Sequence, residues 1–338
     1  MNDSTIPSRT ITIVDVAAEA NVSKSTVSLV LKGSPLIRGD TAERVREAAA
    51  KLGYVYNRRA GELRGNASNA IGVIINDLMN PFFAELLVGI ERKLVEAGYV
   101  VLMAHTNESV EIQQKVLMSM REQNAAGIML CPVLNTPRAF LKTVQSWNIP
   151  FAVFVRNLGP GDYDFAGSDN ELGVFLATTH LLDAGHRQVG FLGGHKGVVL
   201  NQRLAGYKTA LKKKGVAYDP DLVIPATPNR QGGCDSMNTL LSAHADVKAA
   251  VCYNDIVAFG ALSALGERGM RAGADFALIG FDNVLDSQHS NPPLTTVDIR
   301  PNELGERAAD VLLNRIQNPD SARQTYLAQP QLVLRQTA

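Results

Sequence analysis

The apolar residues near the start of the chain recur with a helical period and predict two short helices joined by a turn. Thr12 and Asp15 have the spacing of a capping box, which begins the first helix. Asn21 tolerates the left-handed conformation that ends a helix, and Ser23 is a suitable cap for the next one. The apolar face of that second helix carries Val27, Val30 and Leu31.

The opposite face of the second helix is small and polar, which is the character of a helix that enters a DNA major groove. Lys24 and Ser25 stand at its leading end. An ordinary helical hairpin is the alternative interpretation of these residues. A third helix, with Asp40 as its cap and Gly53 as its stop, completes a miniature bundle.

From residue 70 onward, short apolar runs alternate with amphipathic helices. Strands are predicted at 70–75, 99–104, 126–130, 151–154, 188–192, 249–252, 277–280 and 332–335. Helices are predicted at 81–97, 109–123, 170–184, 201–214, 233–243, 254–268 and 302–317. This alternation is typical of parallel sheets covered by helices. Two such sets predict two similar lobes, with a cleft at the carboxyl ends of their strands.

Composition restricts the class of protein. The 338 residues suit two or three domains, and 46% hydrophobic with 20% charged residues is typical of a soluble globular protein. No apolar run is long enough for a bilayer, and the polar first ten residues lack the core of a secretion signal. Cys131, Cys234 and Cys252 lie far apart, without metal-ligand spacing. We therefore expect a cytoplasmic protein with no bound metal or cofactor.

Charge adds weak support for a nucleic-acid partner. The net charge is zero, but residues 1–66 hold ten Lys and Arg against seven Asp and Glu, so that segment carries +3 and the remainder −3. An asymmetry of this size is modest.

An enzyme is the first rival interpretation, and the sequence disfavours it. The glycines of Gly190–Gly194 follow a predicted strand, but their spacing does not fit a dinucleotide fingerprint. The six histidines show neither metal spacing nor a nucleophile beside them. The second rival is a solute-binding receptor without a role on DNA, which would have the same two lobes.

Several segments, in their order and spacing, resemble the LacI/GalR family of bacterial transcription regulators. The resemblance is carried by residues 12–31, 57–65, 71–73, 80–85, 185–187, 203–207, 252–255, 279–283 and 293–296. It implies an all-α helix-turn-helix headpiece and an α/β, two-lobed, periplasmic-binding-protein-like core with parallel sheets. It also implies a sequence-specific DNA-binding regulator rather than an enzyme, with repression as the family default.

The resemblance divides the chain into three parts. The headpiece is expected at 1–56 and a hinge helix or linker at 57–68. The effector-binding and dimerisation core is expected at 69–338. Within that core the resemblance places the first lobe at about 69–166 and 298–325, and the second at about 167–297 and 326–338.

The family motif also implies which residues meet DNA. Lys24, Ser25 and Leu29 are expected at base edges, where Leu29 offers only apolar contact, for example to a thymine methyl. A phosphate contact is an equal alternative for Lys24. The other expected DNA-binding residues are Thr12, Ser23, Thr26, Ser28, Asn57, Arg58 and Ala60. Thr12 and Ser23 are equally explained as helix caps.

Leu63 is the expected hinge residue. In the family, an apolar side chain here enters the minor groove and kinks the duplex. Packing against the hinge of a partner subunit is the alternative. No leucine heptad follows the last predicted strand, so a homodimer on a palindromic operator is favoured over a tetramer.

The resemblance implies a small-molecule effector in the cleft between the lobes. The expected effector-binding residues are Asn76, Asp77, Asn80, Phe82, Phe83, Arg156, Arg203, Asn254 and Asp282. Amides, carboxylates and an arginine suit the hydroxyls of a sugar or polyol. Asp282 is the expected partner of Arg203. Phe83 is more readily explained as core, and for Asp77 a cap of the helix near Pro81 is the alternative.

The chain also departs from its relatives. Val155 stands where many carry aspartate, and Arg156 follows it, so a sugar phosphate is kept beside a sugar as the expected effector. Residues 27–31 and 252–254 resemble the maltose-system branch of the family. The expected location is the bacterial cytoplasm, in association with the nucleoid.

Overall fold

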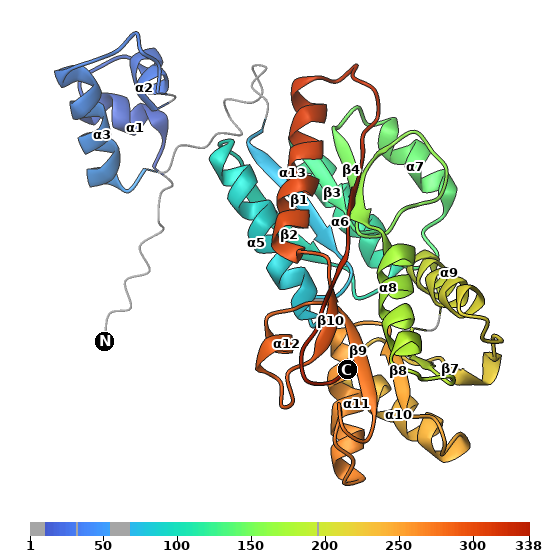
Figure 1. Ribbon diagram of the computed structural model, residues 1–338. Coiled ribbons are helices and arrows are strands. Elements are labelled where there is room, and N and C mark those ends of the chain that lie inside the picture. Colours follow the sequence, from blue (N-terminus) through green and yellow to red (C-terminus); the bar gives the residue numbers. More distant parts are fainter. Residues whose placement is uncertain (1–10, 32, 55–67, 195) are drawn as a thin grey trace, which may run out of the picture. The chain divides into compact units, whose positions relative to one another are not determined.

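The computed structural model describes residues 11–31, 33–54, 68–194 and 196–338. The chain forms two compact units, at 1–67 and 68–338. The first unit contains α1 (Ile13–Glu19), α2 (Lys24–Leu31) and α3 (Asp40–Leu52), coloured blue in Figure 1. Val16, Val27 and Val45 are fully buried, one from each helix, so a single small core holds the three together.

Most ends of these helices are formed by the capping residues that the sequence predicts. The backbone N–H of Thr12 donates to the Asp15 carboxylate at 2.8 Å, and the Thr12 hydroxyl donates to the same group at 2.7 Å. Asn21 has φ +50°, which is the left-handed conformation expected of it. The Ser23 hydroxyl accepts from the Thr26 N–H at 3.1 Å. Asp40 was expected as the cap of α3 but is its first residue, because Gly39 occupies the cap position with φ +68°.

The first lobe of the second unit is built on a parallel sheet in the order β11-β5-β4-β3-β1-β2. The strands are β1 (Ala70–Ile75), β2 (Val100–His105), β3 (Gly127–Leu130), β4 (Phe151–Phe154), β5 (Asp164–Ser168) and β11 (Thr325–Ala328). The second lobe has the order β12-β10-β9-β8-β6-β7. Its strands are β6 (Gly190–Leu192), β7 (Val223–Ile224), β8 (Ala249–Cys252), β9 (Ala277–Asp282), β10 (Thr295–Asp298) and β12 (Gln331–Val333). Only the β10–β12 pairing among these is antiparallel.

Helices cover both sheets, as the alternating pattern predicts. In the first lobe they are α5 (Pro81–Glu96), α6 (Val110–Glu122), α7 (Arg138–Gln145) and α13 (Pro301–Gln317). In the second lobe they are α8 (Asn170–Asp183), α9 (Val198–Lys213), α10 (Arg230–Ala243), α11 (Asp255–Glu267), α12 (Asp286–His289) and the single 3-10 turn Pro220–Leu222. Figure 1 shows α5 and α13 side by side, and a Cβ at Gly89 would lie 2.0 Å from the Asn302 carbonyl oxygen. Glycine therefore permits this close helix contact.

The chain passes between the lobes three times: from β5 to α8, from β10 to α13 and from β11 to β12. These positions change the predicted lobe limits slightly. Because β11 hydrogen-bonds to β5, the first lobe extends to Ala328 rather than to 325. The first passage also comes after Ser168 rather than after 166.

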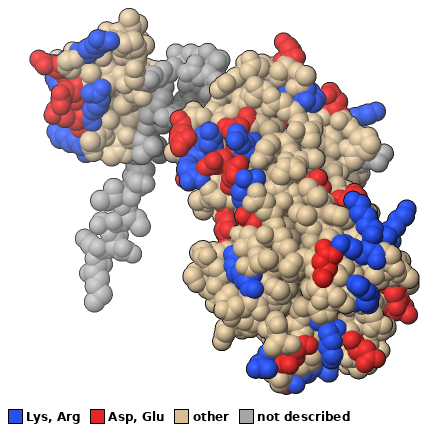
Figure 2. Space-filling view, viewed as in Figure 1, with Lys and Arg blue, Asp and Glu red and all other residues tan. Residues whose placement is uncertain are grey.

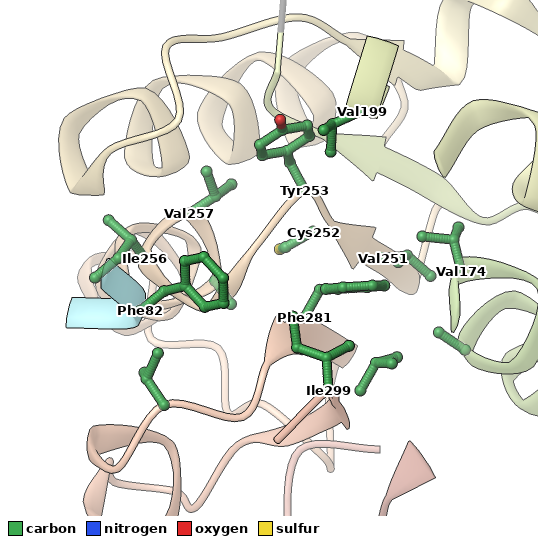
Figure 3. Close-up of a cluster of buried hydrophobic side chains, with 14 of the residues drawn as sticks. Phe82, Val174, Val199, Val251, Cys252, Tyr253, Ile256, Val257, Phe281 and Ile299 are labelled. Carbon is green, nitrogen blue, oxygen red and sulfur yellow. The ribbon is translucent and has the colours of Figure 1, made fainter. Parts of the chain in front are cut away.

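A continuous apolar cluster includes residues of both lobes. Figure 3 shows its central part, where Phe281, Cys252 and Tyr253 of the second lobe lie near Phe82 and Ile299. Phe281 is fully buried and Phe82 is 5% exposed. This packing forms an apolar support next to the cleft described below.

Candidate functional site

The outer face of α2 presents the polar end expected of a DNA-reading helix. Lys24 and Ser25 are exposed, and Ser28 and Leu29 are half-buried. Among the described residues, Lys24 has no hydrogen-bond or ion-pair partner, so its charge is available to a ligand outside the chain. By contrast, Lys51 on α3 pairs with Glu19 at 2.6 Å.

The remaining predicted DNA contacts divide into two groups. The hydroxyls of Thr12, Ser23 and Thr26 are engaged in local caps, which confirms the capping interpretation of the first two and leaves a DNA contact as a second role for all three. The hinge residues Asn57, Arg58, Ala60 and Leu63 lie outside the described residues.

The second candidate site is a cleft of about 350 Å³ between the two lobes of residues 68–338. It lies where several strands end, as expected for parallel sheets. All nine predicted effector residues line it: Asn76, Asp77, Asn80, Phe82, Phe83, Arg156, Arg203, Asn254 and Asp282. Sequence reasoning missed others that line it, including Asn107, Glu108, Asn170, Lys196, Thr227 and Tyr253.

Arg203 on α9 organises the second-lobe side of the cleft. Its Nε donates to Oδ1 of Asn170 at 2.9 Å, and its Nη1 donates to the backbone carbonyl of Tyr253. Its Nη2 lies 3.6 Å from Oδ1 of Asp282, the partner expected from the sequence. The guanidinium also sits 3.7 Å from the ring centroid of Phe281. Since its side chain is only 7% exposed, Arg203 is chiefly a positioning residue for the groups around it.

Asp282 and Asn254 are held by the ends of regular elements. Asp282 closes β9 with φ +115°, and burial raises the pKa of its carboxyl to about 7 despite the opposing effect of Arg203. Asn254 caps α11, because its Oδ1 accepts from the N–H of Val257 at 3.1 Å. Its Nδ2 has no partner within the described part of the chain and remains free to donate to a ligand.

The first-lobe side contains Asn76, Asp77 and Asn80, which follow β1. The helix cap is Asn80, whose Oδ1 accepts from the N–H of Phe82 at 3.1 Å. The alternative interpretation of Asp77 as the cap of this helix is therefore wrong. Asp77 instead accepts from the N–H of Met79 at 2.9 Å, which stabilises the preceding turn.

The aromatic side chains at the cleft wall belong mostly to the hydrophobic core. Phe82 and Phe83 are each 5% exposed and pack edge to face, with ring centroids 5.1 Å apart. The structure thus agrees with the core interpretation of Phe83, although both rings reach the cleft wall. Tyr253, which the sequence did not single out, supplies a third ring and lies beneath Arg203 at 4.7 Å.

Arg156 is paired with Glu108, a residue that sequence reasoning missed. The distance from Arg156 Nη1 to Glu108 Oε1 is 2.6 Å. Oε1 also accepts from Asn76 Nδ2 at 2.7 Å, while Oε2 accepts from the N–H of Leu134 at 2.9 Å. The sequence could have indicated Glu108 as a cleft residue, because it follows a predicted strand at the sheet edge where ligand-binding groups gather.

The backbone is strained at several cleft positions. Asn107, Glu108 and Val155 have φ values of +47°, +59° and +63°. For a β-branched valine this conformation is unusual, and such strain persists only where the surroundings enforce it. These residues follow β2 and β4, so the strain occurs where the sheet presents side chains to the cleft.

Other kinds of site are not found in the described ranges. No group of three or more His, Cys, Asp or Glu side chains is placed to hold a metal ion there. None of the helices in those ranges has the length and apolar character needed to cross a membrane. Figure 2 shows acidic and basic side chains interspersed on the visible face of residues 68–338.

Comparisons with known proteins find a match in each of the two units of the chain. The family model for bacterial regulatory proteins of the lacI family matches residues 12–57, and the model for a periplasmic binding protein-like domain matches residues 178–338. A ribose operon repressor of Haemophilus influenzae is 31% identical over 96% of this chain and 98% of that protein.

Two solved structures are similar over most of the chain. The lac repressor dimer bound to operator and the anti-inducer ONPF has 27% identity and a TM-score of 0.85, covering 97% of this chain and 99% of that one. A regulator from Enterococcus faecium with bound ribose has 26% identity and a TM-score of 0.73, covering 80% of this chain and 98% of that one. The predicted combination of a helical headpiece and a two-lobed core is thereby confirmed.

Proposed function

Because the chain belongs to the lacI family of bacterial regulatory proteins and is a transcriptional regulator, we propose that it is a homodimeric repressor controlled by a small polyhydroxylated ligand. The observation that carries this proposal is the presence of two sites in one chain. A compact unit at 1–67 holds the DNA-facing helix, and a separate unit at 68–338 holds the cleft. A solute-binding receptor without a DNA role would not need the first unit.

On DNA, we propose that α2 lies in the major groove. Lys24, Ser25 and Leu29 read base edges, since they occupy the accessible side of a helix whose other side is buried. Residues around Leu63 enter the minor groove, as the family motif implies. The supporting contacts with the phosphate backbone come from Thr12, Ser23, Thr26, Ser28 and Asn57, and the DNA is also contacted by Arg58 and Ala60.

The ligand class follows from the cleft. Side-chain amides and charged groups at its wall can satisfy hydroxyls, while Tyr253 and Phe82 provide apolar surface for a sugar ring. The similarity to a ribose operon repressor and to a regulator with bound ribose supports a carbohydrate. The sugar itself, and the branch of the family, stay predictions.

A homodimer is supported by apolar side chains that the single chain leaves in water. On α5, Val88 and Val95 are 55% and 53% exposed. On β2, the edge strand of the first sheet, Val100 and Met103 are 52% and 46% exposed. Exposed apolar surface beside an unpaired sheet edge favours association with another copy. The related lac repressor is itself a dimer on its operator.

The proposal places the protein in the bacterial cytoplasm, with the nucleoid as its site of action. Its test compares the full chain with residues 68–338. Both should gain thermal stability with the right sugar, and only the full chain should bind DNA, with a steep dependence on salt.

The operator sequence can be identified by selecting the duplexes that the protein binds from a random pool. The sequences bound by the full chain should converge on a two-fold symmetric site. Retained DNA binding by residues 68–338, or enriched sites without symmetry, would contradict the proposal.

A further inference from the structure

Glu108 joins three parts of the first lobe at the wall of the cleft. Its Oε1 accepts from Arg156 Nη1 at 2.6 Å and from Asn76 Nδ2 at 2.7 Å. Its Oε2 accepts from the backbone N–H of Leu134 at 2.9 Å. A carboxylate can accept about four hydrogen bonds, so Glu108, which lines the cleft, keeps acceptor capacity beyond these three.

Arg156, which also lines the cleft, keeps unused donors. Its Nη1 reaches Glu108 and, at 3.4 Å, the carbonyl oxygen of Pro132. Among the described residues, no hydrogen bond involves its Nε or Nη2, and its side chain is 13% exposed. The guanidinium that carries these donors is paired with Glu108, and both residues line the cleft.

The backbone that positions this ion pair adopts left-handed conformations, which are unfavourable for most residues other than glycine. Glu108 has φ +59° and follows Asn107 at φ +47°, while Arg156 follows Val155 at φ +63°. No glycine relieves the strain at these positions. Such conformations are unfavourable, most of all for the β-branched Val155, and persist only where the surrounding structure enforces them.

The pair neutralises the charge of Arg156 inside the cleft. The lining contains three cations, Arg156, Lys196 and Arg203, and three carboxyl groups, Asp77, Glu108 and Asp282. The two arginines each face a carboxylate, at 2.6 Å for Glu108 and 3.6 Å for Asp282. A phosphate placed against Arg156 would therefore approach the Glu108 carboxylate as well.

We propose that Glu108 is the specificity-determining residue that makes the cleft select an uncharged polyol over its phosphate ester. This proposal rests on the proposed function, since it concerns the ligand of the same cleft. A hydroxyl can donate to Glu108 and accept from Arg156 at once. A phosphate dianion can only accept, and it meets like charge at close range. Of the two ligand classes expected from the sequence, the sugar is thus retained and the sugar phosphate is not.

The test measures binding to the full chain by calorimetry. The probes are ribose, glucose and cellobiose, together with ribose 5-phosphate, glucose 6-phosphate and inorganic phosphate. For the wild type, we expect each phosphate ester to bind at least tenfold more weakly than its parent sugar. Glu108→Gln keeps a similar shape and removes the charge, so it should bind inorganic phosphate at least tenfold more tightly than the wild type does.

Two further variants test whether the gain in phosphate affinity comes from the unpaired Arg156. In the double variant Glu108→Gln/Arg156→Gln, the gain in phosphate affinity should disappear, because it requires the unpaired guanidinium. Glu122→Gln on α6 makes the same change of charge at an exposed position outside the cleft and should behave as the wild type does. Circular dichroism and melting temperature establish that each variant is folded.

The outcomes separate this inference from the proposed function. Tighter binding of an ester than of its sugar by the wild type, or unchanged phosphate affinity in Glu108→Gln, would overturn the role of Glu108 and leave a ligand-controlled repressor intact. If no sugar binds but Glu108→Gln gains phosphate affinity through Arg156, the charge selection stands and the proposed sugar class fails.

Discussion

Oε1 of Glu85 accepts a hydrogen bond from the backbone N–H of Leu285 at 2.7 Å, and this bond connects the two lobes. Glu85 lies on α5 of the first lobe, whereas Leu285 precedes α12 of the second. Burial raises the pKa of the Glu85 carboxyl, and the nearby Asp286 and Asp298 act in the same direction. The contact therefore helps to hold the lobes in the arrangement that forms the cleft.

We expect Glu85→Ala to weaken ligand binding about fivefold, because a hydrogen bond of this kind contributes about 1 kcal/mol to the arrangement that the ligand needs. Calorimetric titration with the sugar that raises the melting temperature measures this. Glu91→Ala, at an exposed position on the same helix, is the control.

The donor side of the bond offers an independent check. Leu285 has φ −49°, which proline can adopt, so Leu285→Pro removes the N–H with little change in the backbone. Its effect should equal that of Glu85→Ala, and combining both should cause no further loss. Additive losses would show that the bond does not couple the lobes.

Lys24 on α2 is expected to contact either a base edge or a phosphate, and mutation distinguishes the two. If it reads a base, Lys24→Ala should lower the affinity for the selected operator by about 1–3 kcal/mol and that for random DNA much less. A uniform loss, with the salt slope reduced by about one, would identify a phosphate contact instead. Lys51→Ala is the matched control, since Lys51 lies on α3 and is paired with Glu19.

Arg203→Ala should lower the free energy of unfolding by about 3–5 kcal/mol, because it leaves the buried Asp282 carboxylate without its cation. Arg203→Lys should also weaken ligand binding, since one ammonium group cannot reach Asn170, Tyr253 and Asp282 together. Urea unfolding measures the first effect and calorimetry the second. Full stability of Arg203→Ala would contradict the positioning role. Lys212→Ala, exposed on the same helix, should be neutral.

The pH dependence of stability should involve Asp255, a fully buried carboxyl on α11. It accepts from the Thr296 hydroxyl at 2.5 Å and from the Val284 N–H at 2.9 Å. Burial, and then the charge of Asp282, raise its pKa well above the ordinary value. The folded state thus binds this proton more tightly than the unfolded state, so stability from this group is complete below the unfolded pKa and is lost as pH rises.

Asp255→Asn removes this titration and can keep both hydrogen bonds, because the Thr296 hydroxyl can turn to accept from the new amide. Its stability relative to the wild type should therefore increase between pH 4.5 and pH 8, as measured by urea unfolding at several pH values. A difference that stays constant with pH would rule out this account. Asp255→Ala should be less stable than the wild type at every pH, because it leaves both donors unpaired.

The sequence predicts best where structure is set locally. The predicted bounds of β1, β4 and β8 agree with the structure, because each is a short run of apolar residues between clear turn signals. The left-handed Asn21 and the Ser23 cap were recognised for the same reason.

Elements that depend on distant partners were missed. β5 begins with Asp164, whose burial is explained by Arg315 of α13, at 2.7 Å and 151 residues further along the chain. β11 and β10 are short and mark the points where the chain changes lobes. Glu108 was missed because its position depends on two successive left-handed residues without glycine, which local propensity does not predict.

The pairing of β11 with β5 has a consequence for biosynthesis. Residues 325–328 complete the sheet that begins at residue 70, so the first lobe lacks an edge strand until residue 328 has left the ribosome. The second lobe, by contrast, draws most of its sheet from one continuous stretch. Its own edge strand, β12 at 331–333, is made later still, so both sheets stay incomplete until this part of the chain emerges, and a stop codon shortly before residue 325 would leave both lobes without an edge strand.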